Sequence, residues 1–180
     1  MQADEAGFLL RFLLPQLQSE QRVTKKILTA VPPDQGSYKP SAKSRSAMEL
    51  AWHIAVSEIW LLDAIIHRQF GEISPKPPAV KACQDVALWY EENFARRVPL
   101  LEALSGDDLA TPVEFHDLRN DPAVAYLNIA IRHSVHHRGQ LSTYLRAMGA
   151  RVPAIYVESA DEPYPPIVAN VAGNAPPPAF

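Results

Sequence analysis

The sequence predicts an all-α fold, a bundle of four long helices followed by a proline-rich C-terminal tail. The 17 prolines of the 180-residue chain gather in short clusters. Because proline disrupts helix interiors, the proline-poor stretches between these clusters are the candidate helices. Apolar residues recur at helical spacing within them, and no alternating strand pattern competes. Long helices joined by short loops are typical of helix bundles.

The first two predicted helices differ in how clearly they are marked. Residues 3–30 have apolar residues at helical spacing, but Pro15 is expected to interrupt this helix. Residues 46–70 contain neither proline nor glycine and are rich in alanine, leucine, isoleucine and tryptophan. Ser46 followed three residues later by Glu49 is a capping box, which predicts the start of this helix.

The next two helices are predicted over residues 79–104 and 121–148. Pro99 falls late in the former and is expected to kink or shorten it. The end signals of the latter are Asp121 as N-cap, Pro122 at the first helical position and Gly149 as C-cap.

The chain divides into a bundle over residues 1–162 and a proline-rich tail over residues 163–180. Residues 105–120 form a longer connection with room for a short helix. The many prolines after residue 150 exclude a long helix there. This segment is either disordered or packs back on the bundle through its apolar residues, Ile155, Tyr156, Val157 and Ile167.

Composition excludes several classes of function. A net charge of −3 argues against a surface built to neutralise phosphates, so no nucleic-acid partner is expected. A single cysteine, Cys83, cannot form an internal disulfide, which favours a cytoplasmic location. No signal-peptide pattern opens the chain, and no apolar run approaches the ~18 residues of a membrane span. No membrane partner is therefore expected.

Two of the six histidines are predicted to point into the core from the last helix. At 100° per residue, His133 and His137 fall on one apolar stripe with Tyr126 and Tyr144, whereas His136 falls on a more polar side. The i, i+4 spacing stacks two imidazoles within reach of one ion. Two buried imidazoles without a metal would need hydrogen-bond partners instead.

A third ligand has to come from another helix, and His53 is the best candidate. It lies in the apolar half of its helix, whereas His67 lies ~21 Å further along, beside Arg68 at the helix end. His116 sits in a polar loop and is expected to be exposed. A site with three nitrogen ligands leaves a position open to water or substrate, which favours catalysis over a purely structural role.

Two familiar metal motifs are absent. Ser134 follows His133, so the sequence lacks the His-Glu-x-x-His pattern and its general base. No Glu-x-x-His pair occurs on two helices, which argues against a di-iron carboxylate bundle.

Three segments resemble the DinB-like superfamily. The run from His133 to Gly149, with the pattern His-Ser-Val-His-His-Arg-Gly-Gln, is similar to the signature of its last helix. Residues 50–60, around His53, resemble its second helix. Residues 152–156, together with Asp161-Glu162, resemble the segment that comes after the last helix in many members. The resemblance spans residues 1–162.

This resemblance implies an up-down-down-up four-helix bundle with a metal site at His53, His133 and His137, the residues that the helical wheel selects. Bound ions in the family vary among nickel, zinc and iron, and many members are homodimers. Characterised relatives include bacillithiol transferases and mycothiol-dependent maleylpyruvate isomerases, while others are described only as metal-dependent hydrolases. A shared fold does not by itself fix a reaction.

The leading hypothesis from the sequence is a metal-dependent enzyme that uses a low-molecular-weight thiol for S-transfer to a small-molecule substrate. The metal would stabilise the thiolate. Gln140 and Tyr144, one turn beyond the ligands, are expected to line the cofactor pocket. Arg138 is expected to be a solvated surface residue, with contact to an acidic thiol as the alternative.

Two other interpretations stay open. Metal-assisted hydrolysis needs a carboxylate base near the ion, and neither Glu49 nor Glu58 is expected on the inner helix face. A non-enzymatic metal-binding or stress-response module needs a closed coordination sphere, for which His136 and Cys83 are weak candidates. A packing role is commoner for a lone cysteine.

Overall fold

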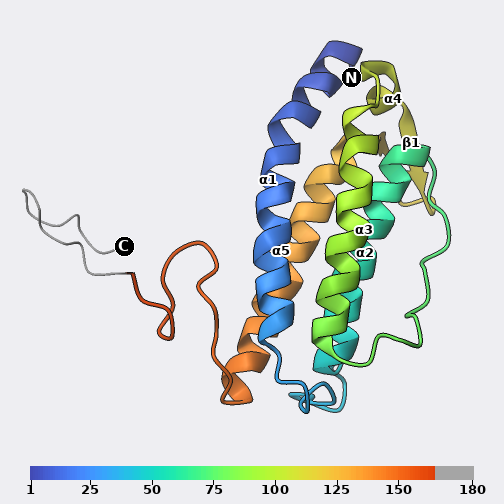
Figure 1. The fold of residues 1–180 in the computed structure, drawn as a ribbon. Helices are drawn as coiled ribbons and strands as arrows, with labels where there is room; N and C mark the ends of the chain where they lie inside the picture. Colours follow the sequence, from blue (N-terminus) through green and yellow to red (C-terminus); the bar gives the residue numbers. More distant parts are fainter. Residues whose placement is uncertain (165–180) are drawn as a thin grey trace, which may run out of the picture.

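The structure is a computed structural model that describes residues 1–164 and is mostly helical. Figure 1 shows the path of the chain. In order, its elements are α1 (Ala3–Ala30), α2 (Ala47–His67), α3 (Cys83–Glu102), α4 (Gly106–Ala110), β1 (Pro112–Phe115), β2 (Arg119–Pro122) and α5 (Ala125–Ala147).

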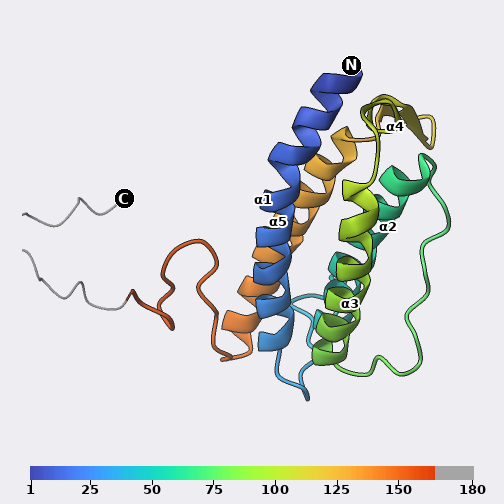
Figure 2. The same cartoon turned by 45° about the horizontal axis from the view of Figure 1, so that its top comes forward.

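The four long helices lie side by side around an apolar core. α2 packs against α3 and α5, and α1 packs against the same two helices (Figures 1 and 2). Residues 68–82 run back along the length of the helices, so α3 points the same way as α2 (Figure 1). The prediction of a helical fold is confirmed at this level, and α4 supplies the short helix expected in the connection.

A two-stranded hairpin before α5 corrects the prediction that the chain contains only helices. β1 and β2 are antiparallel, and Asp121 pairs with Val113 instead of capping a helix. α5 accordingly begins at Ala125, not at Asp121. Each strand has four residues, and Val113 is the one fully buried side chain among them. Strands this short with one buried position give no alternating pattern to read.

Pro15 does not interrupt α1, which corrects a second prediction. The helix runs unbroken from Ala3 to Ala30 with Pro15 on its exposed side, where water can reach the carbonyl that loses its partner. Phe8 and Phe12 also lie outside the core, stacked on each other at 6.2 Å between ring centroids. The face that packs inward carries Ala6, Leu10, Leu14, Leu17, Gln21, Thr24, Ile27 and Leu28.

α2 is the most deeply buried of the long helices. Its predicted capping box is confirmed: Ser46 Oγ accepts from the Glu49 backbone N–H, and the Glu49 carboxylate accepts from the Ser46 N–H. By length and composition α2 could cross a membrane, contrary to the expectation from the sequence, but 67% of its most apolar stretch is buried inside the protein. Packing between α3 and α5 explains its hydrophobicity.

The helix-end signal of α5 is confirmed, and the chain beyond it packs back on the bundle. Gly149 has φ +71°, and the N–H groups of residues 149 and 150 bond to carbonyls of the last turn. Val152 and Ile155 contact the core, whereas Tyr156 and Val157, which were also expected to pack inward, are exposed. Lys26 of α1 binds both the Ala154 carbonyl and Glu162. Ile167 lies outside the described residues, and the division of the chain at residues 162 and 163 stays a prediction.

Candidate metal centre

The three histidines selected from the sequence come together between α2 and α5. His53 Nε2 lies 3.1 Å from His133 Nε2 and 3.1 Å from His137 Nε2. One nitrogen from each ring falls within 4.8 Å of the other two. Each side chain is partly buried, so the cluster lies between the core and the surface.

Hydrogen bonds at the far ring nitrogens orient two of these imidazoles. His137 Nδ1 lies 2.8 Å from Gln140 Oε1, which can only accept, so Nδ1 carries the proton and Nε2 presents a lone pair. Gln140 Nε2 in turn lies 3.1 Å from His136 Nε2. His53 Nδ1 lies 3.3 Å from Ser57 Oγ, one turn along α2. Such outer contacts fix the tautomer of metal-binding histidines.

Burial keeps the three rings neutral. It lowers the pKa of His53 and of His133 to about 4 in each case, with smaller contributions from neighbouring histidines and from Arg45. Burial also lowers the pKa of His137. At neutral pH the rings therefore hold no extra protons, and their lone pairs are available to a cation.

The protein alone does not satisfy this arrangement. Each Nε2 has one in-plane direction for a proton or a lone pair, yet His53 Nε2 faces two other Nε2 atoms at hydrogen-bond distance. His133 Nδ1 is buried without a partner, a condition shared among the described side chains only by Gln84 Oε1. One cation between the three nitrogens would satisfy all three lone pairs, so the residues present fit a divalent metal.

The remaining histidines lie outside the cluster. His67 and His116 are both exposed, which confirms the prediction for His116. His136 is also exposed and bonds to Gln140, so it adds no fourth nitrogen. Cys83 is buried beside Met48, with Sγ 3.9 Å from Met48 Sδ, in agreement with a packing role.

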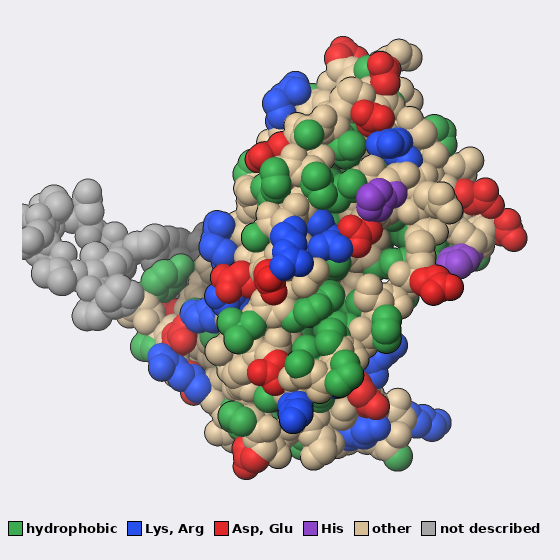
Figure 3. All heavy atoms as spheres, turned by 45° about the vertical axis from the view of Figure 1, so that its right-hand side comes forward, with side chains coloured by type: hydrophobic (Ala, Val, Ile, Leu, Met, Phe, Trp, Pro, Cys, Tyr) green, Lys and Arg blue, Asp and Glu red, His purple; other side chains and the backbone are tan. Residues whose placement is uncertain are grey.

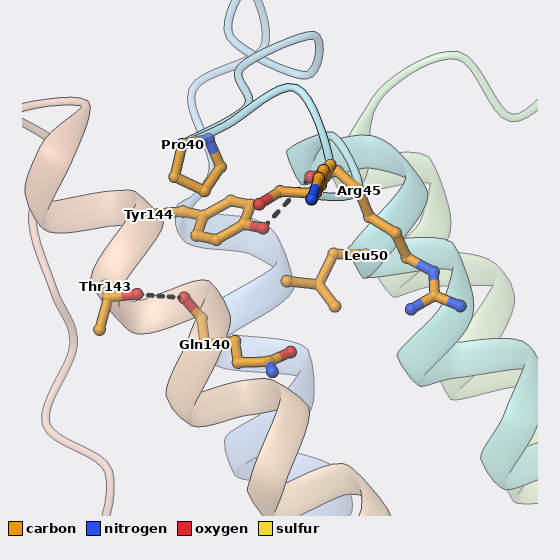
Figure 4. A pocket seen from close by; sticks show the side chains of 8 residues that line it. Pro40, Arg45, Leu50, Gln140, Thr143 and Tyr144 are labelled. Atoms are coloured by element: carbon orange, nitrogen blue, oxygen red, sulfur yellow. Dashed lines mark hydrogen bonds between the residues drawn. The ribbon is translucent and has the colours of Figure 1, made fainter.

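A pocket opens beside the cluster, between the loop before α2 and the C-terminal half of α5 (Figure 4). Its volume is about 640 Å³, within the usual range for small-molecule sites. Gln140 and Tyr144, expected here from the sequence, both line it. The full lining is Pro40, Lys43, Ser44, Arg45, Leu50, Gln140, Thr143 and Tyr144.

Arg138 corrects the expectation of a solvated surface residue, because its side chain is 1% exposed. It donates to the Glu20 carboxylate, to the Glu20 carbonyl at 2.9 Å and to Thr24 Oγ1 at 3.1 Å. The Tyr156 hydroxyl, from the segment after α5, lies 2.6 Å from Arg138 Nη2. This arginine therefore ties α5 to α1 and to residue 156, and it is not available to a cofactor.

Glu58 was also expected to point away from the inner face, and this prediction is wrong. Its side chain is fully buried and accepts hydrogen bonds from Tyr90 of α3 and Ser134 of α5. Burial raises the pKa of this carboxyl to about 7, against the opposing effect of the two hydroxyl donors. Its hydrogen-bond partner Ser134 directly follows the candidate ligand His133 in the sequence, but Glu58 itself lies outside the histidine cluster.

Two contributors to the site escaped the sequence reasoning. Ser57 follows His53 at i+4, and that spacing was the available signal. No sequence pattern predicts that Arg45 and the loop around it lie next to the histidines. Only tertiary packing brings this loop to α5, where the Tyr144 hydroxyl donates to the Arg45 carbonyl at 3.2 Å.

Comparison with known sequences identifies relatives over most of the chain. The sequence model of the DinB family matches residues 6–166. An uncharacterized protein of Bacillus subtilis strain 168, YjoA, is 30% identical over 133 residues, which cover 73% of this chain and 85% of that protein.

Solved structures agree with this assignment. The crystal structure of the DinB-like protein YjoA from Bacillus subtilis has 26% identity and a TM-score of 0.65, covering 79% of this chain and 96% of that one. A DinB-like protein from Bacillus cereus ATCC 10987 has 25% identity and a TM-score of 0.68, covering 80% and 95%. A DinB-family member from Exiguobacterium sibiricum, at 23% identity and a TM-score of 0.55, covering 78% and 92%, shares the fold.

Proposed function

Because the chain belongs to the DinB family, we propose that it is a metal-dependent enzyme in which His53, His133 and His137 hold one divalent ion. The observation that carries this proposal is the convergence of three neutral Nε2 atoms that cannot all be satisfied by one another. Three protein ligands leave part of the coordination sphere open, and the neighbouring pocket gives a small molecule access to it. Nickel, zinc and iron are the candidate ions.

The reaction class we propose is S-transfer from a low-molecular-weight thiol to an electrophilic small molecule. The ion supplies stabilisation of the thiolate, the nucleophilic form of the thiol. The three histidines act as ligands without a part in proton transfer. Ser57 and Gln140 hold the rings of His53 and His137, and Tyr144 shapes the pocket in which thiol and acceptor meet.

Hydrolysis is the alternative reaction, and the site favours it less. The metal cluster contains no carboxylate. Glu58 is enclosed by its bonds to Tyr90 and Ser134 and has no exposed surface from which to activate water. Thiol-dependent loss of an electrophilic dye substrate, abolished by His137→Ala, would support S-transfer. Ester or amide turnover without thiol would support hydrolysis.

Metal content is the first test. We expect elemental mass spectrometry of the untagged protein, after supply of nickel, zinc and iron, to give about one ion per chain, as one three-ligand site requires. His53→Ala, His133→Ala and His137→Ala should each lose it, while His136→Ala, the neighbouring exposed histidine, should keep it. A metal-free parent protein, or equal loss from His136→Ala, would refute the proposed function.

A purely structural ion is the remaining alternative, and it predicts a different result. A protein that holds the ion only for stability shows no turnover and a large fall in melting temperature on chelation. An enzyme with an open site should keep its fold on chelation, because the three histidines are not among the residues of the apolar core.

The proposal also covers the helix topology, the oligomeric state, the cellular location and the partners of the protein. We infer an up-down-down-up four-helix bundle that works as a cytoplasmic homodimer on a small-molecule substrate, without nucleic-acid or membrane partners. Acidic and basic side chains are mixed over the face shown in Figure 3, with hydrophobic side chains between them. That face has no single-sign field of the kind that nucleic acids require.

A further inference from the structure

The pocket beside the histidines has an unbalanced charge. Its lining contains two cations, Lys43 and Arg45, and no carboxylate. Within residues 1–164 neither cation forms an ion pair, although Lys39 of the same loop pairs with Glu49 at 3.3 Å. Lys39, which lies outside the pocket, is therefore neutralised by Glu49, whereas, within the described residues, the positive charges of Lys43 and Arg45 at the edge of the pocket are not neutralised.

Arg45 is positioned by contacts that hold its backbone. The Tyr144 hydroxyl donates to the Arg45 carbonyl, and the Tyr144 ring packs edge-on against Tyr38 at 5.7 Å between centroids. In Figure 4 this hydroxyl points at the loop, and the Arg45 side chain runs along the start of α2, past Leu50. His53 lies one turn beyond Leu50, so the guanidinium extends toward the histidines.

The pocket that contains Arg45 adjoins the histidine cluster. Gln140 lines the pocket, and its Oε1 lies 2.8 Å from His137 Nδ1. Leu50 also lines the pocket, one turn before His53 on α2. A molecule bound at Arg45 would therefore have the three histidines next to it.

We propose that this pocket binds a small organic acid, with Arg45 and Lys43 holding a carboxylate while the rest of the molecule faces the three histidines. A guanidinium fork matches a carboxylate in two parallel hydrogen bonds, and a lysine ammonium adds a point charge. Leu50, Pro40 and the Tyr144 ring are the smaller, apolar part of a mostly polar lining, and a short carbon skeleton can lie against them. The inference rests on the proposed function in taking this acid as substrate or thiol cofactor of the metal site.

Succinate, its neutral analogue succinamide and inorganic phosphate serve as probes, followed by NMR titration of the backbone amides of the full chain. Succinate should shift the amides of residues 43–45 and 140–144, and succinamide should not. Arg45→Gln should weaken succinate binding about tenfold or more, the usual effect of losing a charge-assisted hydrogen bond. Lys39→Gln removes the same charge from the same loop outside the pocket, and it should leave the affinity unchanged.

Several results would overturn the proposal. These are no shifts with succinate up to its solubility limit, equal binding of succinamide, tighter binding of phosphate than of succinate, or equal weakening by Lys39→Gln. His133→Ala separates this inference from the metal site. If this variant loses its metal but still binds succinate, the anion site stands. If its succinate binding disappears, the carboxylate binds the ion and not Arg45, and the inference fails while the proposed function survives.

Discussion

Two polar regions inside the same group of helices differ in how completely they are satisfied. In the region that we call the buried polar network, each side chain has at least one hydrogen-bond partner. In the histidine cluster, His53 Nε2 faces the Nε2 atoms of both His133 and His137, and its single in-plane direction cannot satisfy both. Satisfied buried groups hold a fold together, whereas unsatisfied ones mark where a ligand belongs. The network comprises the buried side chains of Thr24, Glu58, Tyr90, Ser134 and Arg138, and Arg138 extends it to the partly exposed Glu20 and the exposed Tyr156.

The largest effect expected from this contrast is on stability at Arg138. Arg138→Ala removes a buried charge and leaves Glu20 without its ion-pair partner, which should lower the free energy of unfolding by about 3 kcal/mol or more. Arg146→Ala is the matched control, since it removes another arginine of α5 whose partner, Asp161, is near the surface. It should cost less than about 1 kcal/mol. Urea unfolding measures both, and equal losses would show that the network is not a stabilising element.

The second prediction concerns pH. The pKa of Glu58 is raised from about 4.5 to about 7 in the folded protein, so its contribution to stability is full below pH 4.5 and is lost as pH rises to 7. Glu58→Gln does not titrate. Relative to the variant, the parent protein should therefore lose on the order of 3 kcal/mol of unfolding free energy between these pH values. Histidine titration is common to both proteins and cancels in the difference.

Urea unfolding of parent and variant across pH 4 to 8 measures this difference. A constant difference would mean that the Glu58 carboxyl has the same pKa in the folded and the unfolded protein, so that burial does not raise it. Glu49→Gln is the control, because burial is not what shifts that exposed carboxyl, whose pKa is lowered by its bonds to Ser46. It should show the opposite slope.

The histidine cluster could be predicted from the sequence, and the buried network could not. His133 and His137 share a helical stripe, and periodicity within one helix reports which side faces inward. Charged residues such as Arg138 and Glu58 are usually exposed, so the sequence offered no reason to expect either side chain in the core. Their burial depends on partners from α1 and α3, which no local pattern encodes.

Some elements of the fold could likewise be predicted from the sequence, and others could not. Proline clusters and the Ser46 capping box predicted where the long helices lie, because these signals act within a few residues. The continuity of α1 through Pro15 and the hairpin at residues 112–122 depend on packing between distant segments. In the first case, tertiary packing keeps the helix continuous although a proline predicted a break. In the second case, the hairpin forms although no local pattern predicted it.

The smallest effect, and the sharpest test of the contrast, is expected at Ser57, which contacts the cluster without belonging to it. Ser57→Ala removes the partner of His53 Nδ1, so we expect metal affinity to fall about tenfold while the metal-free protein loses less than about 1.5 kcal/mol of stability. Ser142→Ala is the control, since this serine donates to the Arg138 carbonyl at 2.9 Å and does not touch a histidine. Competition with a chromogenic chelator measures the affinity of each protein. If Ser142→Ala weakens metal binding as much as Ser57→Ala, the effect comes from general loosening of the helices, and the orienting role of Ser57 is refuted.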